Sequence, residues 1–362
     1  MKLQQRSVAV ISSGNGGQAL AAYYALHGYE VRLYARQQER VEMFPGLDFE
    51  LQGVVSGTAH LSLISCDMEQ VIQGAALIMV TTPAQYHAVI ARAMAPYLRD
   101  GQTVVLNPGR TFGVLEFDTV LRKSGCHARI LLAEADTFVF TCRCEKPGHP
   151  AIYQIKDVLR VAALHPCDTA SVCLQLRSLF PCVQPAANLL ETGLSNIGML
   201  FHPVPTLMNL VRVEAKEQFL YYHEGISPMV ASLIERMDAE RVQLARAAGV
   251  SVLPVLDWVR TRYGSQGDTL YQAIQNTDAY AGVFGPTDLH TRYLYEDVPT
   301  GCVPMAALGR LLQVPMPITE AVIQWAGTVC NLDFYSIGRN ETRLDLRSLL
   351  ENSPPSSTLS AH

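Results

Sequence analysis

A glycine-dense turn near the N-terminus constrains the fold of this chain more than any other sequence feature. Residues 7–11 form an apolar run typical of a buried strand, and the small residues after Asn15 are typical of a closely packed helix. The turn between them reads Ser12-Ser-Gly-Asn-Gly-Gly17. In such a strand–turn–helix unit, glycines let the backbone approach a phosphate at the positively polarised start of the helix. The segment therefore predicts the first unit of a nucleotide-binding α/β domain.

The turn departs from the usual three-glycine pattern at one position. Ser12 stands where the first glycine is expected, while Gly14 and Gly17 occupy the second and third positions. A serine is compatible with a strand end if its φ is negative, and its hydroxyl can donate a hydrogen bond to a phosphate. We expect a cofactor loop made of Ser12, Gly14, Asn15, Gly16 and Gly17. The alternative is an ordinary tight turn that binds nothing.

The end of the second expected strand indicates which nicotinamide cofactor the loop serves. A carboxylate about twenty residues after the glycines would bind the ribose 2′-hydroxyl of NAD. Ala35 and Arg36 stand there instead, and Arg40 follows one helical turn later. Because a guanidinium binds a 2′-phosphate with paired hydrogen bonds, we expect Arg36 to favour NADPH over NADH. The alternative is a solvated arginine on a surface loop.

The first half of the chain alternates strand and helix patterns. Further strands are expected at residues 75–80, 103–106 and 128–133, each followed by a turn. This alternation predicts a Rossmann-type, doubly wound parallel sheet over residues 1–185. Ligands collect beyond the carboxyl ends of such strands, so Thr82, Pro83 and Asn107 join the expected cofactor site.

The second half of the chain has a different periodicity. Helical patterns are present at residues 214–248, with interruptions at Gly225 and Pro228, and at residues 317–332. They predict an all-helical domain over residues 186–350, with the substrate in the cleft between the two domains. The polar, proline-rich residues 351–362 are expected to be a disordered tail.

Composition excludes several classes of protein. A formal net charge of -5 over 362 residues gives no basic field for nucleic acid, and no apolar run reaches membrane-spanning length. The nine cysteines have neither metal-ligand spacing nor histidine partners, so reduced thiols and no metal site are expected. The first residues lead into a strand rather than an apolar signal segment, and we expect a cytoplasmic protein.

Two segments of the helical half contain candidate catalytic residues. His202 lies among apolar residues and prolines, and a second segment contains Arg292 and Asp297. If His202 and Asp297 pair, the carboxylate fixes the imidazole tautomer and the histidine becomes a general acid/base. Arg292 would then bind a substrate carboxylate. The residues alone favour the other interpretation, a structural histidine and an Arg292–Asp297 salt bridge.

At these segments the chain resembles the opine dehydrogenase family of octopine- and nopaline-type enzymes. The resemblance extends over nearly the whole chain, and the order and spacing of its motifs are together more specific than any single motif. It is carried by Gly14-Asn-Gly-Gly17, Asn107-Pro-Gly109, Phe140-Thr-Cys-Arg143, His202-Pro-Val-Pro-Thr206, Tyr222-His-Glu-Gly225, Asp238-Ala-Glu-Arg241, Thr291-Arg-Tyr293 and Glu296-Asp297.

This resemblance implies a reductive condensation of an α-keto acid with the amine of an amino acid. It implies that His202 is the acid/base, that Asp297 is its partner and that Arg292 is a ligand of a substrate carboxylate. Asn196 and Thr141, which lie in or beside the matching segments, are assigned to substrate binding as well. A homodimer is expected, although no interface can be named.

Two other functions remain open at this stage. Ketopantoate- or glycerol-phosphate-type reductases have a similar layout, but they use a lysine in the helical domain. Lys216 is the only lysine after Lys156, and it lies in a charged, surface-like stretch. A non-catalytic NADPH-binding redox sensor is the third hypothesis, although a sensor has no need of His202, Arg292 and Asp297.

Overall fold

The computed structural model describes residues 7–351, which form parts of two compact units. The units are Met1–Thr192 and Gly193–His362, and the helix α7 (Leu189–Leu194) runs across their boundary. The sequence placed this boundary a few residues earlier, between residues 185 and 186. Glu351 ends the helix α18 (Leu346–Glu351), and the remainder of the expected tail lies outside the described residues.

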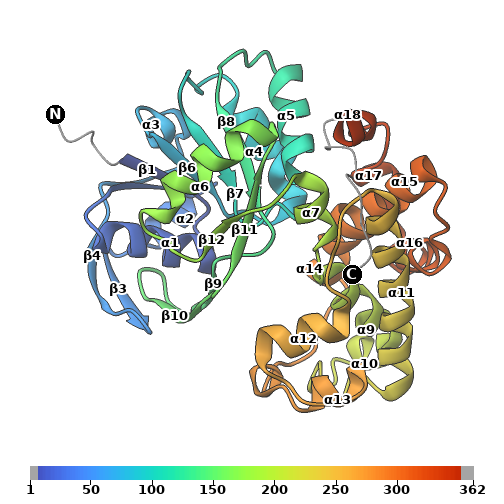
Figure 1. The fold of residues 1–362 in the computed structure, drawn as a ribbon. Coiled ribbons are helices and arrows are strands. Elements are labelled where there is room, and N and C mark those ends of the chain that lie inside the picture. Colours follow the sequence, from blue (N-terminus) through green and yellow to red (C-terminus); the bar gives the residue numbers. More distant parts are fainter. Residues whose placement is uncertain (1–6, 352–362) are drawn as a thin grey trace. The chain divides into compact units, whose positions relative to one another are not determined.

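An eight-stranded sheet forms the centre of the first unit, with the strand order β12-β11-β8-β7-β6-β1-β2-β5 (Figure 1). Neighbouring strands are parallel except β8 and β11, which are antiparallel. The sheet is therefore a doubly wound Rossmann-type sheet, as expected, but its β11–β12 edge is reversed. Its strands are β1 (Ser7–Ile11), β2 (Glu30–Tyr34), β5 (Leu63–Ser65), β6 (Leu77–Val80), β7 (Thr103–Leu106), β8 (Leu131–Ala135), β11 (Leu159–Ala163) and β12 (Val183–Pro185).

The strand order reverses at β1, which lies between β2 and β6. Right-handed crossovers then place α1 (Asn15–Leu26) on one face and α3 (Met68–Ile72), α4 (His87–Met94) and α5 (Gly113–Lys123) on the other. Every residue of β1 is buried, because both of its faces are covered. The reversal creates the crevice at which doubly wound sheets bind their ligands.

A second, four-stranded sheet was not predicted from the sequence. Its order is β4-β3-β10-β9, and α1 packs against strands of both sheets (Figure 1). The strand β3 alternates buried and exposed residues, and most of β4 is exposed, so neither resembles the continuous apolar runs of the large sheet. The strands are β3 (Asp48–Gly53), β4 (Gly57–His60), β9 (Phe140–Cys144) and β10 (Pro150–Ile155).

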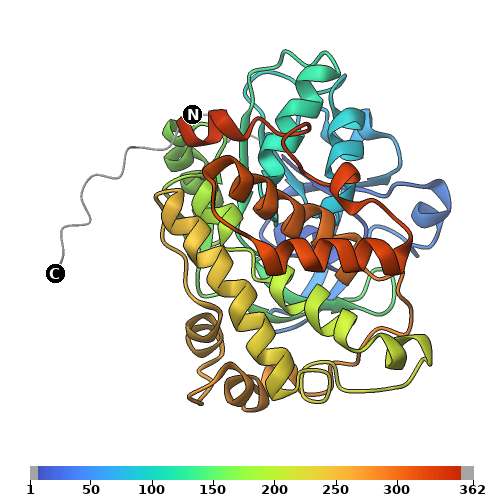
Figure 2. The ribbon, with the colours of Figure 1, turned by 90° about the vertical axis from the view of Figure 1, so that its right-hand side faces the viewer.

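The second unit is helical, as the sequence predicted. Its long helix α11 (Pro228–Ala247), yellow in Figure 2, contacts α9, α12, α13, α15 and α16. The bounds of the principal helices are α8 (Gly198–Phe201), α9 (Pro203–Met208), α10 (Leu210–Glu214), α12 (Val255–Tyr263), α13 (Leu270–Gln275), α14 (Arg292–Tyr295), α15 (Val303–Leu312), α16 (Pro317–Cys330) and α17 (Phe334–Ile337).

Apart from Glu214 itself, residues 214–248 are helical only from Pro228 onward, which agrees with the interruptions expected at Gly225 and Pro228, but residues 215–227 are not helical. The helix α10 ends at Glu214, and α11 begins only at Pro228, where Ser227 caps it by accepting a hydrogen bond from the Val230 amide. Lys216 has a left-handed backbone with φ of 54°, which no helix continues through. The helix expected at residues 317–332 is observed as α16, and it ends at Cys330.

Buried charges of α11 hold the helical unit together. The Arg241 guanidinium is fully buried, and it donates to the Asp238 carboxylate and to the carbonyls of Leu194 and Leu253. Glu240 accepts hydrogen bonds from the first amides of α16 at Ile318 and Thr319. The Asp238–Arg241 motif is therefore structural, because its two charged side chains bond to each other and to backbone groups. Within the described residues, no helix is both long enough and apolar enough to cross a membrane.

Candidate active site

The predicted cofactor loop connects β1 to α1. A Cβ atom on Gly17 would lie 1.8 Å from the Ser12 carbonyl oxygen, so only glycine lets the helix start this close to the strand end. Gly14 is the N-cap of α1, and no side chain caps this helix end. The Ser12 hydroxyl accepts a hydrogen bond from the Gly14 amide at 3.2 Å. The first amides of α1, from Asn15 onward, can therefore serve an anion.

Gln18 anchors the back of this loop, and the sequence analysis missed it. Its buried amide donates to the Ser13 carbonyl at 2.8 Å and accepts from the Gly148 amide at 2.9 Å. These bonds tie the loop to the β9–β10 hairpin of the small sheet. Gly16 faces the Phe138 ring, where an added Cβ atom would come within 2.8 Å. The loop is thus shaped by tertiary contacts as well as by its glycines.

The other predicted cofactor residues of the sheet lie at the carboxyl ends of two neighbouring strands. Thr82 and Pro83 follow β6, and Asn107 follows β7. In the part of the chain that the structure describes, the Thr82 hydroxyl and the Asn107 side-chain oxygen are buried without a hydrogen-bond partner. Because buried polar atoms are normally bonded, these two atoms fit a polar ligand at this edge. The residues present therefore suit a dinucleotide.

Two arginines flank the expected adenosine end of that ligand. Arg36 is exposed after β2, and its guanidinium carbon lies 5.3 Å from the centre of the Tyr86 ring. Arg40 donates to the Ser13 carbonyl of the glycine loop at 3.2 Å. The residue at the expected carboxylate position, Ala35, is buried. Two arginines thus stand near the position where an NAD-type site has a carboxylate for the ribose.

In the helical unit, the structure brings His202 and Asp297 together. The His202 Nδ1 atom lies 2.7 Å from Asp297 Oδ2, and the exposed fractions of the two side chains are 16% and 0%. The Tyr293 ring stacks on the imidazole with centres 4.3 Å apart and planes inclined by 15°. The ring is thus held at one nitrogen and on one face, which leaves Nε2 to act on a ligand.

Arg292 pairs with Glu296 rather than with Asp297. Its Nε atom lies 3.1 Å from Glu296 Oε2, and half of the arginine side chain is exposed. The alternative Arg292–Asp297 salt bridge is therefore wrong. Arg292 is the first residue of α14, and the C-cap of this helix, Glu296, directly precedes Asp297.

The two remaining predicted substrate residues lie in different units. Asn196 is buried, accepts a hydrogen bond from the Gly198 amide at 3.1 Å and lies beside Gly301. Thr141 is exposed on β9 of the first unit.

Comparisons with known proteins agree with this arrangement. Residues 185–330 match the family model "NAD/NADP octopine/nopaline dehydrogenase, alpha-helical domain", and residues 7–114 match "NAD-dependent glycerol-3-phosphate dehydrogenase N-terminus". The opine dehydrogenase of Arthrobacter sp. strain 1C is 37% identical, and the alignment covers 96% of this chain and 97% of that protein. The chain belongs to the opine dehydrogenase family. It is an NAD(P)-dependent oxidoreductase that acts on a CH–NH bond.

More distant members have the same fold. The octopine dehydrogenase of Pecten maximus is 26% identical over 88% of this chain and 89% of that protein. A solved structure of octopine dehydrogenase with NADH and L-arginine has a TM-score of 0.81 at 22% identity and covers 98% of this chain and 99% of that one. The NADP+-bound structure of yersinopine dehydrogenase has a TM-score of 0.75 at 16% identity, with 96% and 97% covered.

The helical domain of this opine dehydrogenase family member contains an aromatic cluster. It consists of Phe201, Tyr222, Trp258, Tyr263 and Tyr280. Tyr222 and Tyr280 stack with ring centres 3.9 Å apart. Burial raises the pKa of both phenols, so both hydroxyls stay protonated. The five rings form a connected set of contacts, and Phe201 directly precedes His202 in the chain.

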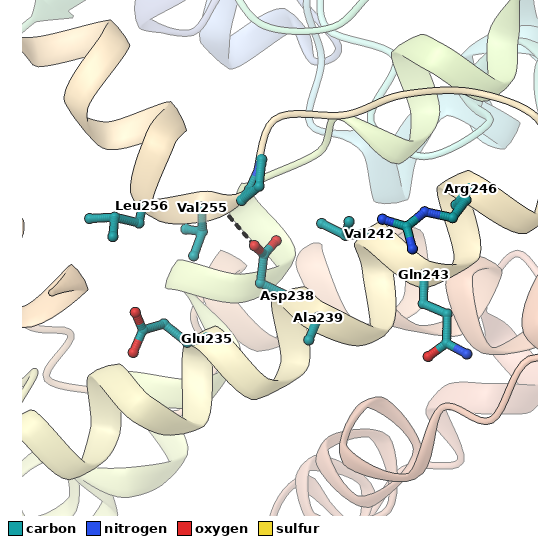
Figure 3. Close-up of a pocket in the computed structure, with 9 residues that line it drawn as sticks. Glu235, Asp238, Ala239, Val242, Gln243, Arg246, Val255 and Leu256 are labelled. Atoms are coloured by element: carbon teal, nitrogen blue, oxygen red, sulfur yellow. Dashed lines mark hydrogen bonds between the residues drawn. The ribbon is translucent and has the colours of Figure 1, made fainter. Parts of the chain in front are cut away.

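A separate cavity of 440 Å³ lies between α11 and the start of α12 (Figure 3). Figure 3 shows Asp238 projecting from α11 toward Val255, whose amide donates to that carboxylate at 2.6 Å. The residues that line this cavity include Glu235, Gln243 and Arg246, and they do not include His202, Arg292 or Asp297. The catalytic candidates of this opine dehydrogenase family member therefore lie outside it.

Proposed function

We propose that the protein catalyses the NADPH-dependent condensation of an α-keto acid, such as pyruvate, with the amino group of an L-amino acid. The product is an N-(1-carboxyalkyl) amino acid. The observation that carries this proposal is the buried His202–Asp297 pair in the helical domain of an opine dehydrogenase family member. Solved octopine dehydrogenase structures with NADH and pyruvate, or with NADH and L-arginine, support the substrate classes.

The reaction requires a proton donor and acceptor at one position. The amine adds to the keto carbon, the C–O bond breaks as water leaves, and the resulting imine is reduced. The reduced nicotinamide, when bound, supplies the hydride for that last step. His202 Nε2 exchanges the proton with the reacting oxygen or nitrogen, while Asp297 accepts the Nδ1 proton and stabilises the imidazolium that forms. This division of roles needs both ring nitrogens, as the observed geometry provides.

Substrate carboxylates require a cation near His202. Arg292 fits this role because half of its side chain is exposed, while its Nε atom is held by Glu296 at 3.1 Å. Asn196, whose side chain lies beside Gly301, is proposed as a second substrate contact. Thr141 of the first unit completes the proposed substrate set.

The proposed cofactor is NADPH in preference to NADH. Arg36, with Arg40 beside it, would bind the 2′-phosphate, and no carboxylate stands at the end of β2 to bind a free 2′-hydroxyl. The pyrophosphate would lie on Ser12, Gly14, Asn15, Gly16 and Gly17, and the nicotinamide half would lie near Thr82, Pro83 and Asn107. Cytoplasmic location and a homodimer complete the proposal, with the free thiols supporting the first.

The direct test follows NADPH oxidation by absorbance with pyruvate or another α-keto acid, with and without a panel of L-amino acids. Oxidation that depends on the amine and favours NADPH over NADH is the expected result. Oxidation by the keto acid alone would overturn the proposal in favour of a 2-hydroxy acid or ketopantoate-type reductase. NADPH binding without any turnover would favour the redox sensor.

A further inference from the structure

His202 lies in a part of the chain where helical hydrogen bonds are missing. It joins α8 to α9, and it is followed by Pro203 and Pro205. In a helix, the carbonyl of each residue accepts from the amide four residues later, and proline has no amide hydrogen. The carbonyls of Met199 and Phe201 therefore lose the donors that residues 203 and 205 would supply.

Side chains from distant segments supply hydrogen-bond donors to both of these carbonyls. The Cys302 thiol donates to the Met199 carbonyl with an S···O distance of 3.8 Å. The Tyr221 hydroxyl lies 3.1 Å from the Phe201 carbonyl oxygen and 2.7 Å from the His202 carbonyl oxygen. The chain around His202 is thus completed by hydroxyl and thiol groups in place of backbone amides.

Thr206 joins Tyr221 at the His202 carbonyl. Its hydroxyl donates to that oxygen at 2.7 Å and lies 2.9 Å from the Tyr221 hydroxyl. The Thr206 amide also donates to the His202 carbonyl, at the longer distance of 3.3 Å. Two hydroxyl groups therefore reinforce the weak helical bond directly at the residue that carries the imidazole.

Tyr221 also supports the ring of His202 indirectly. Its own ring centre lies 4.9 Å from that of Tyr293, which stacks on the imidazole. Tyr221 is 0% exposed, and burial raises the pKa of its phenol well above the ordinary value, so it stays a hydrogen-bond donor. A side chain this deeply buried does not reach a substrate.

We propose that Tyr221 is a positioning residue that fixes the backbone and the ring plane of His202 for proton transfer. This inference rests on the proposed catalytic role of His202. A displacement of about 1 Å is enough to cost a large part of the rate when a reacting group must meet its partner at hydrogen-bond distance. Tyr221 therefore acts on turnover through His202 rather than by contact with the reactants.

The test compares wild type, Tyr221→Phe, His202→Ala and the double variant in the amine-dependent assay. Tyr221→Phe is expected to lower kcat about tenfold while leaving KM within about twofold, because it removes orientation and no substrate contact. In the His202→Ala background, the same change is expected to alter the residual rate less than about twofold. An equal loss in both backgrounds would overturn the proposal.

Thr319→Val is the matched control for stability. Thr319 is another buried hydroxyl of the helical unit, and it bonds to Glu240 at 2.7 Å. Both variants are expected to lower Tm, whereas only Tyr221→Phe lowers kcat of the folded enzyme. If Tyr221→Phe lowers Tm but leaves kcat unchanged, Tyr221 is merely structural and the proposal is wrong.

A second measurement keeps this proposal separate from the proposed function. The ¹⁵N signals of the His202 imidazole, assigned by their loss in His202→Ala, report which ring nitrogen carries the proton. Wild type is expected to show mainly the Nδ1–H tautomer, and Tyr221→Phe a mixture of the two tautomers. Identical spectra would overturn the positioning role. An inactive wild-type protein would count against the proposed function alone, because the spectra need no turnover.

Discussion

His202 Nδ1 lies 2.7 Å from Asp297 Oδ2, although the two residues are separated by 95 positions in the chain. The carboxylate is fully buried and the imidazole is largely buried. A buried carboxylate stays ionised only when it is paired with a donor or a positive charge. The pair therefore has a defined polarity, with Nδ1 donating to the carboxylate and Nε2 available to a reactant.

Removing either member of this pair is expected to stop proton transfer. His202→Ala should lower kcat about 100-fold or more, the usual contribution of a general acid/base. Asp297→Asn should have an effect of similar size, since the amide can stabilise the wrong tautomer. Steady-state turnover with saturating NADPH, pyruvate and the active amine measures both effects, with circular dichroism as the control for folding. Near-wild-type turnover of His202→Ala would remove it from the mechanism.

Gly17→Ala is expected to abolish cofactor binding. The added Cβ atom would lie 1.8 Å from the Ser12 carbonyl oxygen, which would force α1 away from the end of β1. Gly46→Ala is the matched control, because no atom lies within 4 Å of the Cβ atom that it adds. Fluorescence titration with NADPH should show unchanged affinity for Gly46→Ala and a loss of at least about tenfold for Gly17→Ala. Equal affinities would show that the loop does not approach the cofactor closely.

Arg36→Ala is expected to raise KM for NADPH about tenfold and to leave KM for NADH within about twofold. A charge-assisted hydrogen bond contributes roughly 1.5–3 kcal/mol, and NADH has no 2′-phosphate to receive it. Arg122→Ala removes an exposed arginine of α5 that pairs with Asp118, and it controls for the loss of one positive charge. Equal effects on both cofactors would disprove the assignment of Arg36.

Arg292→Ala is expected to raise KM for a carboxylate substrate by about tenfold or more. Arg292→Lys should recover part of this loss, because lysine keeps the charge but cannot form the paired hydrogen bonds of a guanidinium. KM for pyruvate and for the amino acid, measured separately, shows which substrate Arg292 binds. If neither KM changes, the exposed guanidinium serves only its 3.1 Å contact with Glu296.

Stability is expected to fall at alkaline pH. Burial raises the pKa of the Cys142 thiol to about 11, with Cys144 nearby adding to the shift, whereas an unfolded cysteine titrates near about 8.5. Between these values the folded state keeps a proton that the unfolded state has lost, so the free energy of unfolding decreases as pH rises. Below pH of about 8.5 both states are protonated, and this contribution is constant.

Urea denaturation between pH 8 and about pH 11 measures this dependence. In Cys142→Ala the free energy of unfolding is expected to fall less steeply with pH, by a slope that corresponds to at most about one proton. Cys167→Ala, at an exposed position, serves as the control. Identical slopes for wild type and Cys142→Ala would show that the Cys142 thiol does not contribute.

Local sequence was sufficient wherever one short segment determines its own structure. The strand, turn and helix at residues 7–26 follow from an apolar run, a glycine that no other residue can replace and a stretch of small residues. The helix α16 was likewise predicted within two residues at its end, because its apolar periodicity is regular. Resemblance to a family added His202, Arg292 and Asp297 with their expected roles.

Tertiary structure decided everything that depends on which distant residues meet. The small sheet was not predicted because its short strands β3 and β4 contain few buried residues and because β3 pairs with β10, which lies much later in the chain. The pairing of Arg292 with Glu296 is, by contrast, a local effect, because helical spacing places residues four apart side by side.

Residue types and local periodicity were enough to predict the class of fold, which the structure confirms. The cofactor loop and the catalytic residues stay predictions that the same patterns made. The contact of Asp297 with His202 and the anchoring of the glycine loop by Gln18 depend on the folded chain. The fold also supplies Tyr221 for a carbonyl that Pro205 leaves without an amide donor. The physical reason is that hydrogen-bond partners of buried polar groups are chosen by folding, and no local pattern records a partner that lies many residues away.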